Sequence, residues 1–143
     1  MDFTPTTFND IAGIERKTSN ALQLAQSVLF TSGVQHIVET PDGIKTVPPY
    51  VKQALNQLPA NWDETKLITG YPGKLAVIAR RANTTWYIAG VNGENEAKSH
   101  ELDLSFIKGT TLNVISCGNT PRQFSQQQFT ASQTVSISLK GND

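Results

Sequence analysis

The sequence has little charge, and neither sign is in excess. Its 143 residues contain 12 lysines and arginines against 12 aspartates and glutamates, and charged residues make up only 17% of the chain. Proteins that follow a phosphate backbone usually carry a surplus of cations, and here no cationic run is longer than the pair Arg80-Arg81. We therefore expect no nucleic-acid partner.

Cysteine and long apolar runs are also scarce. The one cysteine, Cys117, cannot form a disulfide within the chain, so the fold is expected to be stable without covalent cross-links. A membrane span needs about 18 apolar residues, whereas the longest apolar stretches, Leu75–Ala79 and Tyr87–Val91, have the length of strands. The first residues lack the basic and apolar regions of a secretory signal. We expect no membrane span and no signal peptide in this chain.

The first part of the chain has helical periodicity. Between Thr18 and Val38 apolar residues recur every three or four positions, which predicts an amphipathic helix with Gly33 as its C-cap. After a polar stretch over residues 39–46, a second short helix is predicted to begin at Pro48-Pro49 and to end at Pro59. The sequence therefore predicts two helices within residues 1–61.

The second part has the pattern of short strands. From Thr65 onward, β-branched and aromatic residues occur in runs that turn clusters separate. The predicted fold class is mainly β: an antiparallel β-sandwich of about seven strands in residues 62–143, preceded by two helices. The predicted strands are 65–69, 74–81, 85–91, 99–104, 111–116, 127–130 and 134–139. The predicted core contains Val77, Ile78, Trp86, Ile88, Leu102, Leu104 and Phe106.

Reactive residues do not converge on a catalytic centre in the sequence. His36 and His100 lie on different predicted elements, and neither has a cysteine or a second histidine at metal-ligand spacing. His36 follows the first predicted helix closely, so we interpret it as a capping or packing residue. No glycine-rich phosphate loop and no nucleophile elbow is present. The sequence predicts neither a zinc site nor a serine hydrolase.

Paired carboxylates are stronger catalytic candidates than the histidines, because glycoside hydrolysis needs only two carboxylates across a sugar ring. Glu101 and Asp103 alternate with leucines in a predicted strand, a pattern typical of a solvated face. Glu94 and Glu96 lie in a polar turn that could offer oxygen ligands to calcium, but their spacing does not reproduce an EF-hand loop. We assign neither pair to catalysis or to a metal.

Aromatic side chains suggest an alternative function, a carbohydrate-binding module with exposed aromatics. Trp62, Tyr71, Trp86 and Tyr87 could each stack on a sugar. Trp86 and Tyr87 are neighbours in a strand and face opposite sides, so at most one of them can lie on a given binding face. Core packing is the default for strand aromatics. The two interpretations differ in whether Trp86 or Tyr87 is exposed on a concave face.

Several segments, in their order along the chain, resemble the C-terminal β domain of glycoside hydrolase family 97. Upstream, residues 1–5 and 21–36 resemble the end of that family's catalytic (β/α)8 barrel. The likeness is most specific between Trp62 and Arg81 and weakest after Cys117. The segments that carry it are Trp62-Asp63-Glu64-Thr65-Lys66, Gly70-Tyr71-Pro72-Gly73-Lys74, Val77-Ile78-Ala79-Arg80-Arg81, Trp86-Tyr87-Ile88-Ala89-Gly90 and Leu102-Asp103-Leu104-Ser105-Phe106.

This resemblance implies an accessory domain of a larger enzyme. Family members are three-part α-glucosidases or α-galactosidases, periplasmic or secreted, with calcium near acid and base carboxylates that belong to regions upstream of this sequence. We therefore assign no catalytic residue, metal ligand or cofactor to this chain and expect calcium in the full-length parent enzyme. Asp2 would lie at the end of the last barrel strand. It is a candidate substrate-binding residue with Trp86 and Tyr87, although a loop role is the favoured interpretation.

The implied function is a non-catalytic C-terminal fragment that supports the catalytic barrel of a family 97 glycosidase. The apolar face of the first helix must dock on the sandwich, contact a second copy of the chain or remain mobile. We predict that this face, within residues 19–31, mediates self-association. A strictly monomeric sedimentation profile at high concentration would contradict that prediction.

Overall fold

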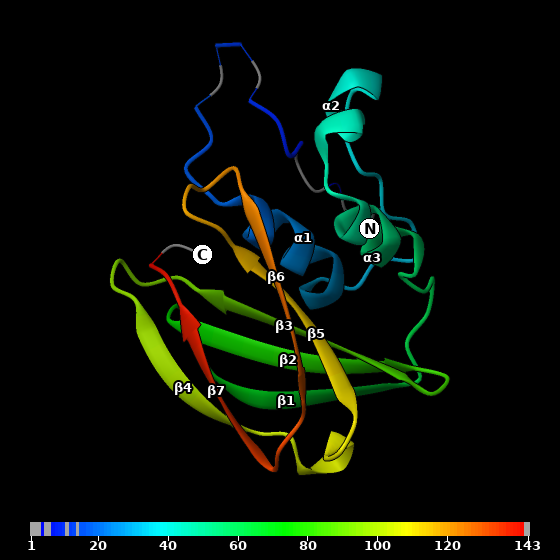
Figure 1. The fold of residues 1–143 in the computed structure, drawn as a ribbon, viewed down its shortest axis with the longest axis vertical. Helices are drawn as coiled ribbons and strands as arrows, with labels where there is room; N and C mark the ends of the chain where they lie inside the picture. The colour runs from blue at the N-terminus through cyan, green and yellow to red at the C-terminus, as the bar shows by residue number, and fades with distance from the viewer. Residues whose placement is uncertain (1–3, 5–6, 11, 14, 142–143) are drawn as a thin grey trace.

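The computed structural model describes residues 4, 7–10, 12–13 and 15–141, which form three helices followed by a set of antiparallel strands (Figure 1). The helices are α1 (Asn20–Leu29), α2 (Pro41–Thr46) and α3 (Pro49–Asn56). The strands are β1 (Glu64–Tyr71), β2 (Leu75–Ala82), β3 (Thr85–Asn92), β4 (Lys98–Asp103), β5 (Thr111–Cys117), β6 (Phe124–Thr130) and β7 (Thr134–Leu139). The mainly β fold class predicted from the sequence is confirmed. Among the described residues, no helix is long and apolar enough to cross a membrane.

Helix α1 is shorter than predicted. Its N-cap is Ser19, whose hydroxyl accepts a hydrogen bond from the backbone N–H of Leu22 at 2.9 Å. The helix ends at Leu29 because Phe30 adopts an extended backbone, so the predicted C-cap at Gly33 is wrong. His36, which we expected to cap this helix or to pack near its end, is exposed. The last helical carbonyls are bound instead by a side chain from the sheet, described below.

Helix α2 was not predicted, so three helices rather than two precede the strands in the described residues. The hydroxyl of Thr40 accepts a hydrogen bond from the N–H of Gly43 at 2.9 Å, and Pro41 occupies the first turn. Asp42 adds a carboxylate near the positive end of the helix. These local signals favour a short helix, although the stretch is too polar to show an apolar face.

The strands form three antiparallel groups. β1, β2 and β3 follow one another in a single sheet, β4 pairs with β7, and β5 pairs with β6. The latter two pairs lie across the first sheet and cover one of its faces (Figure 1). The β2–β3 connection is a tight turn in which Asn83 has a φ of 53°, a backbone region that asparagine tolerates better than most residues. β6 begins at Phe124, earlier than predicted, because a glutamine-rich segment forms an exposed strand there.

The sandwich core lies between the first sheet and the two strand pairs. Val77, Leu102 and Leu104 are 1%, 2% and 2% exposed, as the strand alternation predicts. Trp86, Ile88 and Phe106 pack against them. The remaining predicted core residue, Ile78, belongs to a different cluster on the opposite face of the sheet. The reason is that Ile78 follows Val77 directly, and neighbouring strand residues face opposite sides.

Helix α1 covers the opposite face of the first sheet. Its residues Val28 and Leu29 form a buried cluster with Ala89 of β3, against which Ile78 and Tyr87 pack. Every residue from 19 to 29 is buried or half-buried. Of the three alternatives for this apolar face, docking on the sandwich is the one observed. The face that the sequence offered for self-association is therefore occupied within the chain.

Arg80 of β2 joins α1 to the sheet. Its guanidinium donates hydrogen bonds to the carbonyl oxygens of Val28 at 2.7 Å and Leu29 at 3.1 Å, and to the hydroxyl of Thr65 in β1 at 2.9 Å. Arg80 is only 8% exposed, and the ring of Trp62 lies 6.0 Å from it. The last carbonyls of a helix lack internal partners and carry partial negative charge, so a cation stabilises them. Arg80 therefore supplies the C-terminal cap of α1.

We predict that Arg80→Met lowers the free energy of unfolding by about 3 kcal/mol, because two buried carbonyls lose their charged donor. The matched control is Arg81→Met. Arg81 is the next residue, but its side chain is 32% exposed, and it forms ion pairs with Asp63 and Glu64 at the surface. Such pairs contribute about 1 kcal/mol or less. Denaturant unfolding measures both variants, and equal losses would contradict this assignment.

Candidate functional site

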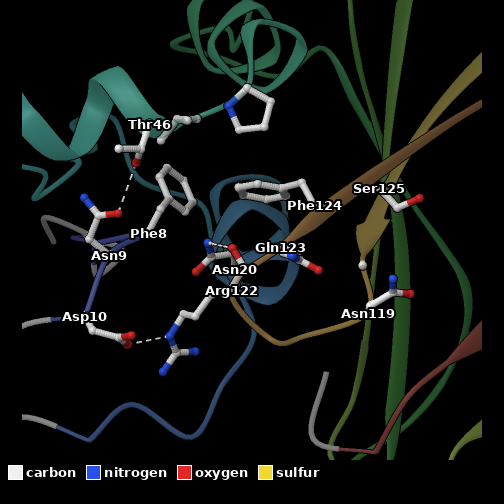
Figure 2. Close-up of a pocket in the computed structure, with 13 residues that line it drawn as sticks. Phe8, Asn9, Asp10, Asn20, Thr46, Asn119, Arg122, Gln123, Phe124 and Ser125 are labelled. Atoms are coloured by element: carbon white, nitrogen blue, oxygen red, sulfur yellow. Dashed lines mark hydrogen bonds and ion pairs between the residues drawn. The ribbon is translucent and has the colours of Figure 1, made fainter.

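A pocket of about 520 Å³ lies where the N-terminal segment meets the turn between β5 and β6 (Figure 2). Phe8, Asn9 and Asp10 form one wall of the pocket. The residues that lead from α2 into α3, 46–48, form a second wall, and residues 118–119 and 122–125 form a third; Asn20 of α1 also lines the pocket. The pocket thus brings together residues from distant parts of the sequence.

Arg122 is the centre of the polar wall. Its Nε lies 2.6 Å from Asp10 Oδ1, and its two terminal nitrogens donate to the carbonyl oxygens of Thr18 and Arg16 at 2.9 and 2.5 Å. The carbonyl of Arg122 in turn accepts a hydrogen bond from the amide of Asn20 at 2.8 Å. Burial lowers the pKa of Arg16, and the neighbouring Arg122 cation lowers it further. These contacts fasten the segment before α1 to the sandwich.

On the other side of the pocket, an aromatic pair and one carboxylate fix the position of Phe8. The rings of Phe8 and Phe124 meet edge to face at 5.4 Å. The carboxylate of Glu39 accepts a hydrogen bond from the N–H of Phe8 at 2.7 Å. Figure 2 shows Asn9 bonded to the hydroxyl of Thr46, which is 3.2 Å from its Oδ1. Arg122, Asn20, Asn9 and Glu39 therefore all bind other parts of the protein, as expected of a structural junction.

Trp86 and Tyr87, the aromatic candidates for substrate binding, pack against other rings, whereas Tyr71 is 67% exposed. The ring of Trp86 meets Phe106 edge to face at 4.7 Å on the sandwich side of the sheet. Tyr87 meets Trp62 at 5.3 Å on the α1 side, and its hydroxyl donates to the carbonyl of Gln57 at 2.7 Å. Both are half-buried, so neither forms an open stacking platform. The third candidate, Asp2, lies outside the described residues.

The carboxylate candidates do not form an acid–base pair. Glu101 and Asp103 are exposed, while Leu102 between them is buried, as the alternation predicts. The N–H of Ser105 lowers the pKa of Asp103, and Lys98 lowers that of Glu94. A glycosidase acid requires the opposite shift, a raised pKa. These groups are therefore suited to surface interactions rather than to proton donation.

The carboxylates of the described residues do not gather into a calcium site. Within the described ranges, no group of three or more histidine, cysteine, aspartate or glutamate side chains could hold a metal ion. In the turn that could have offered calcium ligands, Glu94 forms an ion pair with Lys98 at 2.9 Å, and Glu96 is exposed. The two carboxylates thus do not converge on one position.

An apolar groove of about 410 Å³ lies at the β1–β2 turn, and one of the residues that line it, Tyr71, was singled out from the sequence as a possible sugar-stacking aromatic. Leu67 and Tyr71 border this groove, and each is 67% exposed. Burial alternates regularly along β1 from Glu64 to Ile68, so Ile68 packs towards the core while Leu67 faces the other side and is exposed. A register shift between Leu67 and Thr69 breaks this alternation further along the strand. The adjacent pair Leu67-Ile68 was a second signal in the sequence, because two successive apolar residues in a strand face opposite sides.

Comparisons with known proteins agree on one family. A family model described as "Glycosyl-hydrolase 97 C-terminal, oligomerisation" matches residues 61–142. A probable retaining α-galactosidase of Streptomyces bingchenggensis is 38% identical over 112 residues, covering 78% of this chain and 17% of that protein. A retaining α-galactosidase of Bacteroides thetaiotaomicron is 32% identical over 85 residues, covering 59% of this chain and 12% of that protein.

Solved structures show the same fold. A crystal structure of a β-arabinopyranosidase superposes with a TM-score of 0.83 at 31% identity, over 91% of this chain and 21% of that one. A family 97 glycoside hydrolase from Pseudoalteromonas sp. strain K8, in complex with acarbose, superposes with a TM-score of 0.77 at 25% identity, over 99% of this chain and 25% of that one.

The chain therefore belongs to glycoside hydrolase family 97, and residues 61–142 correspond to the C-terminal domain of that family. This confirms the resemblance recognised in the sequence. The chain spans 17% and 12% of the length of these two curated relatives.

We predict that stability falls on acidification. Glu64 is bound to Arg81 and Lys66, and its pKa is lowered like those of Glu94 and Asp103. Each carboxylate therefore stabilises the fold above its ordinary pKa of 4.5 for glutamate or 3.8 for aspartate. That contribution is lost as pH falls through the lowered value. The melting temperature should decline below about pH 4.5.

The control is Glu64→Gln, which removes one of these titrating groups and should make the decline shallower. High salt should reduce the share of this pH-dependent stability that comes from Glu64 and Glu94, because both form ion pairs that solvent can reach. A melting temperature that rises between pH 5 and pH 3 would contradict the prediction.

Proposed function

We propose that this chain is the non-catalytic C-terminal part of a glycosidase of the α-galactosidase type, which packs against the catalytic barrel and mediates self-association. The observation that carries the proposal is the family match over residues 61–142, whose description names oligomerisation. The names of the two curated relatives support the α-galactosidase type. Calcium in the whole enzyme would be held by residues other than those described for this chain.

The surface for the barrel follows α1. Four large hydrophobic side chains between residues 30 and 38 are exposed: Phe30 at 50%, Val34 at 50%, Ile37 at 36% and Val38 at 51%. A run of exposed apolar side chains in so short a segment is typical of a surface that another unit covers. This segment, residues 30–38, lies outside the C-terminal family match. We therefore assign it to contact with the catalytic barrel.

Self-association through residues 19–31 would be restricted to the end of this segment. Residues 19–29 are buried or half-buried, and only Phe30 and Thr31 are exposed. A contact between copies through the face of α1 would require the helix to leave the sheet and Arg80 to lose its bonds to Val28 and Leu29. The buried face is thus a poor site for self-association, and exposed side chains are the better candidates.

The first test is an activity assay on the 143-residue chain with nitrophenyl α-galactoside and nitrophenyl α-glucoside, in the presence of calcium. We expect no hydrolysis above the buffer rate, because the family resemblance places the acid and base carboxylates in regions upstream of this sequence. Turnover that copurifies with the folded chain would overturn the non-catalytic assignment. The same assay distinguishes an accessory domain from an enzyme that works on its own.

The second test is sedimentation equilibrium of the same chain over a range of concentrations. The monomer mass is 15.6 kDa, and we expect the average mass to rise above this value with concentration. Ideal monomeric behaviour at the highest concentration would overturn the self-association part of the proposal. It would leave the family assignment unchanged.

A further inference from the structure

The surface through which the C-terminal domain would contact a second copy can be located from exposure. The family match that names oligomerisation covers residues 61–142. Within that stretch, the large hydrophobic side chains that are strongly exposed in the described residues are Leu67 and Tyr71. The other exposed apolar group, at residues 30–38, lies outside the match. In the described part of residues 61–142, Leu67 and Tyr71 therefore mark the apolar surface that self-association can use.

Leu67 and Tyr71 border the groove at the β1–β2 turn, and small residues form part of its lining. Gly70 packs closely on β2: a Cβ there would lie 3.0 Å from the carbonyl oxygen of Leu75 and 3.4 Å from Cδ1 of Leu67. Ala76 and Gly93 also line the groove. Large side chains thus project beside a recess lined by small ones, so the surface has both of the shapes that a contact requires.

Such a surface is suited to its own copy. In a two-fold dimer each copy presents the same patch, so the patch must supply both the projecting groups and the recess that receives them. Lys74 is the one charged residue among those that line the groove, and its Nζ lies 5.4 Å from the ring centre of Tyr71. The lining therefore lacks carboxylates that would select a basic partner, and its apolar character favours burial against an equivalent surface.

We infer that the Leu67–Tyr71 groove, formed by Leu67, residues 70–76, Val91 and Gly93, is the surface through which two copies of this chain associate. This inference rests on the proposed self-association and names its residues. A standard dimer buries roughly 800 Å² on each partner. That is about a tenth of the 8643 Å² surface of this chain. An area of this size is larger than the groove alone, so the contact extends beyond the groove along the exposed side of β1.

The test compares two double variants of the 143-residue chain by sedimentation equilibrium. Leu67→Ser with Tyr71→Ser removes the projecting side chains, and we expect the dimer Kd to rise on the order of 100-fold. The matched control is Phe30→Ser with Val34→Ser, which removes two apolar side chains of 50% exposure outside the family match. Its Kd should change by less than about threefold. Unchanged melting temperatures confirm that both variants fold, since all four side chains are exposed.

The outcomes separate this inference from the proposed function. A large effect of the Phe30 and Val34 variant, with no effect of the Leu67 and Tyr71 variant, would overturn the groove and keep self-association. A wild-type chain that stays monomeric would overturn both. Binding of an α-galactoside that quenches tyrosine fluorescence in the wild type but not in Tyr71→Phe/Leu67→Ser, without a change in dimer Kd, would identify the groove as a sugar site and would also overturn the inference.

Discussion

The bond between Arg80 and the end of α1 determines how the helical and β parts of this chain fit together. A guanidinium that is almost fully buried is costly unless its donors are satisfied, and here Val28, Leu29 and Thr65 satisfy them. The same contact supplies partners for helical carbonyls that would otherwise be buried without any. Because the direction of these bonds fixes the helix end over β2, the apolar face of α1 can only lie on the sheet.

That arrangement decides which surfaces remain available. One face of the β1–β2–β3 sheet is covered by the strand pairs β4–β7 and β5–β6, and α1 lies over the other (Figure 1). Arg122 fastens the segment before α1 to the β5–β6 turn, so the helix is held on both sides. In the part of the chain that the structure describes, the large exposed apolar side chains lie in residues 30–38 and at the Leu67–Tyr71 groove. We assign the first to the barrel and the second to another copy, which gives the domain two separate contacts.

The strands were predictable from the sequence because their signals are local. Alternation with a period of two placed Leu102 and Leu104 inside and Glu101 outside without any knowledge of their neighbours. The end of α1 was not predictable in this way, since its cap is Arg80, 52 residues from Val28. Ile78 was assigned to the wrong core because apolar residues on both faces of a strand reveal burial but not what covers each face.

The candidate site was less predictable than the fold for the same reason. Trp86 and Tyr87 attract attention as possible sugar ligands, yet packing against Phe106 and Trp62 occupies them, and no local pattern records those partners. The 67% exposure of Leu67 depends on what covers its side of β1, which the strand pattern does not reveal. The family resemblance could be recognised because it depends on the types of residues and on their order, and the sequence itself contains both.

Hydrogen exchange of the wild-type chain at low and high concentration tests the central claim most directly, because it reports on α1 and on β1 in the same experiment. The account predicts that amides of α1 are protected equally at both concentrations, since the helix is docked within each copy. It also predicts that amides of residues 67–76 become more protected as concentration rises. Protection of α1 that increases with concentration, while residues 67–76 exchange at an unchanged rate, would contradict it.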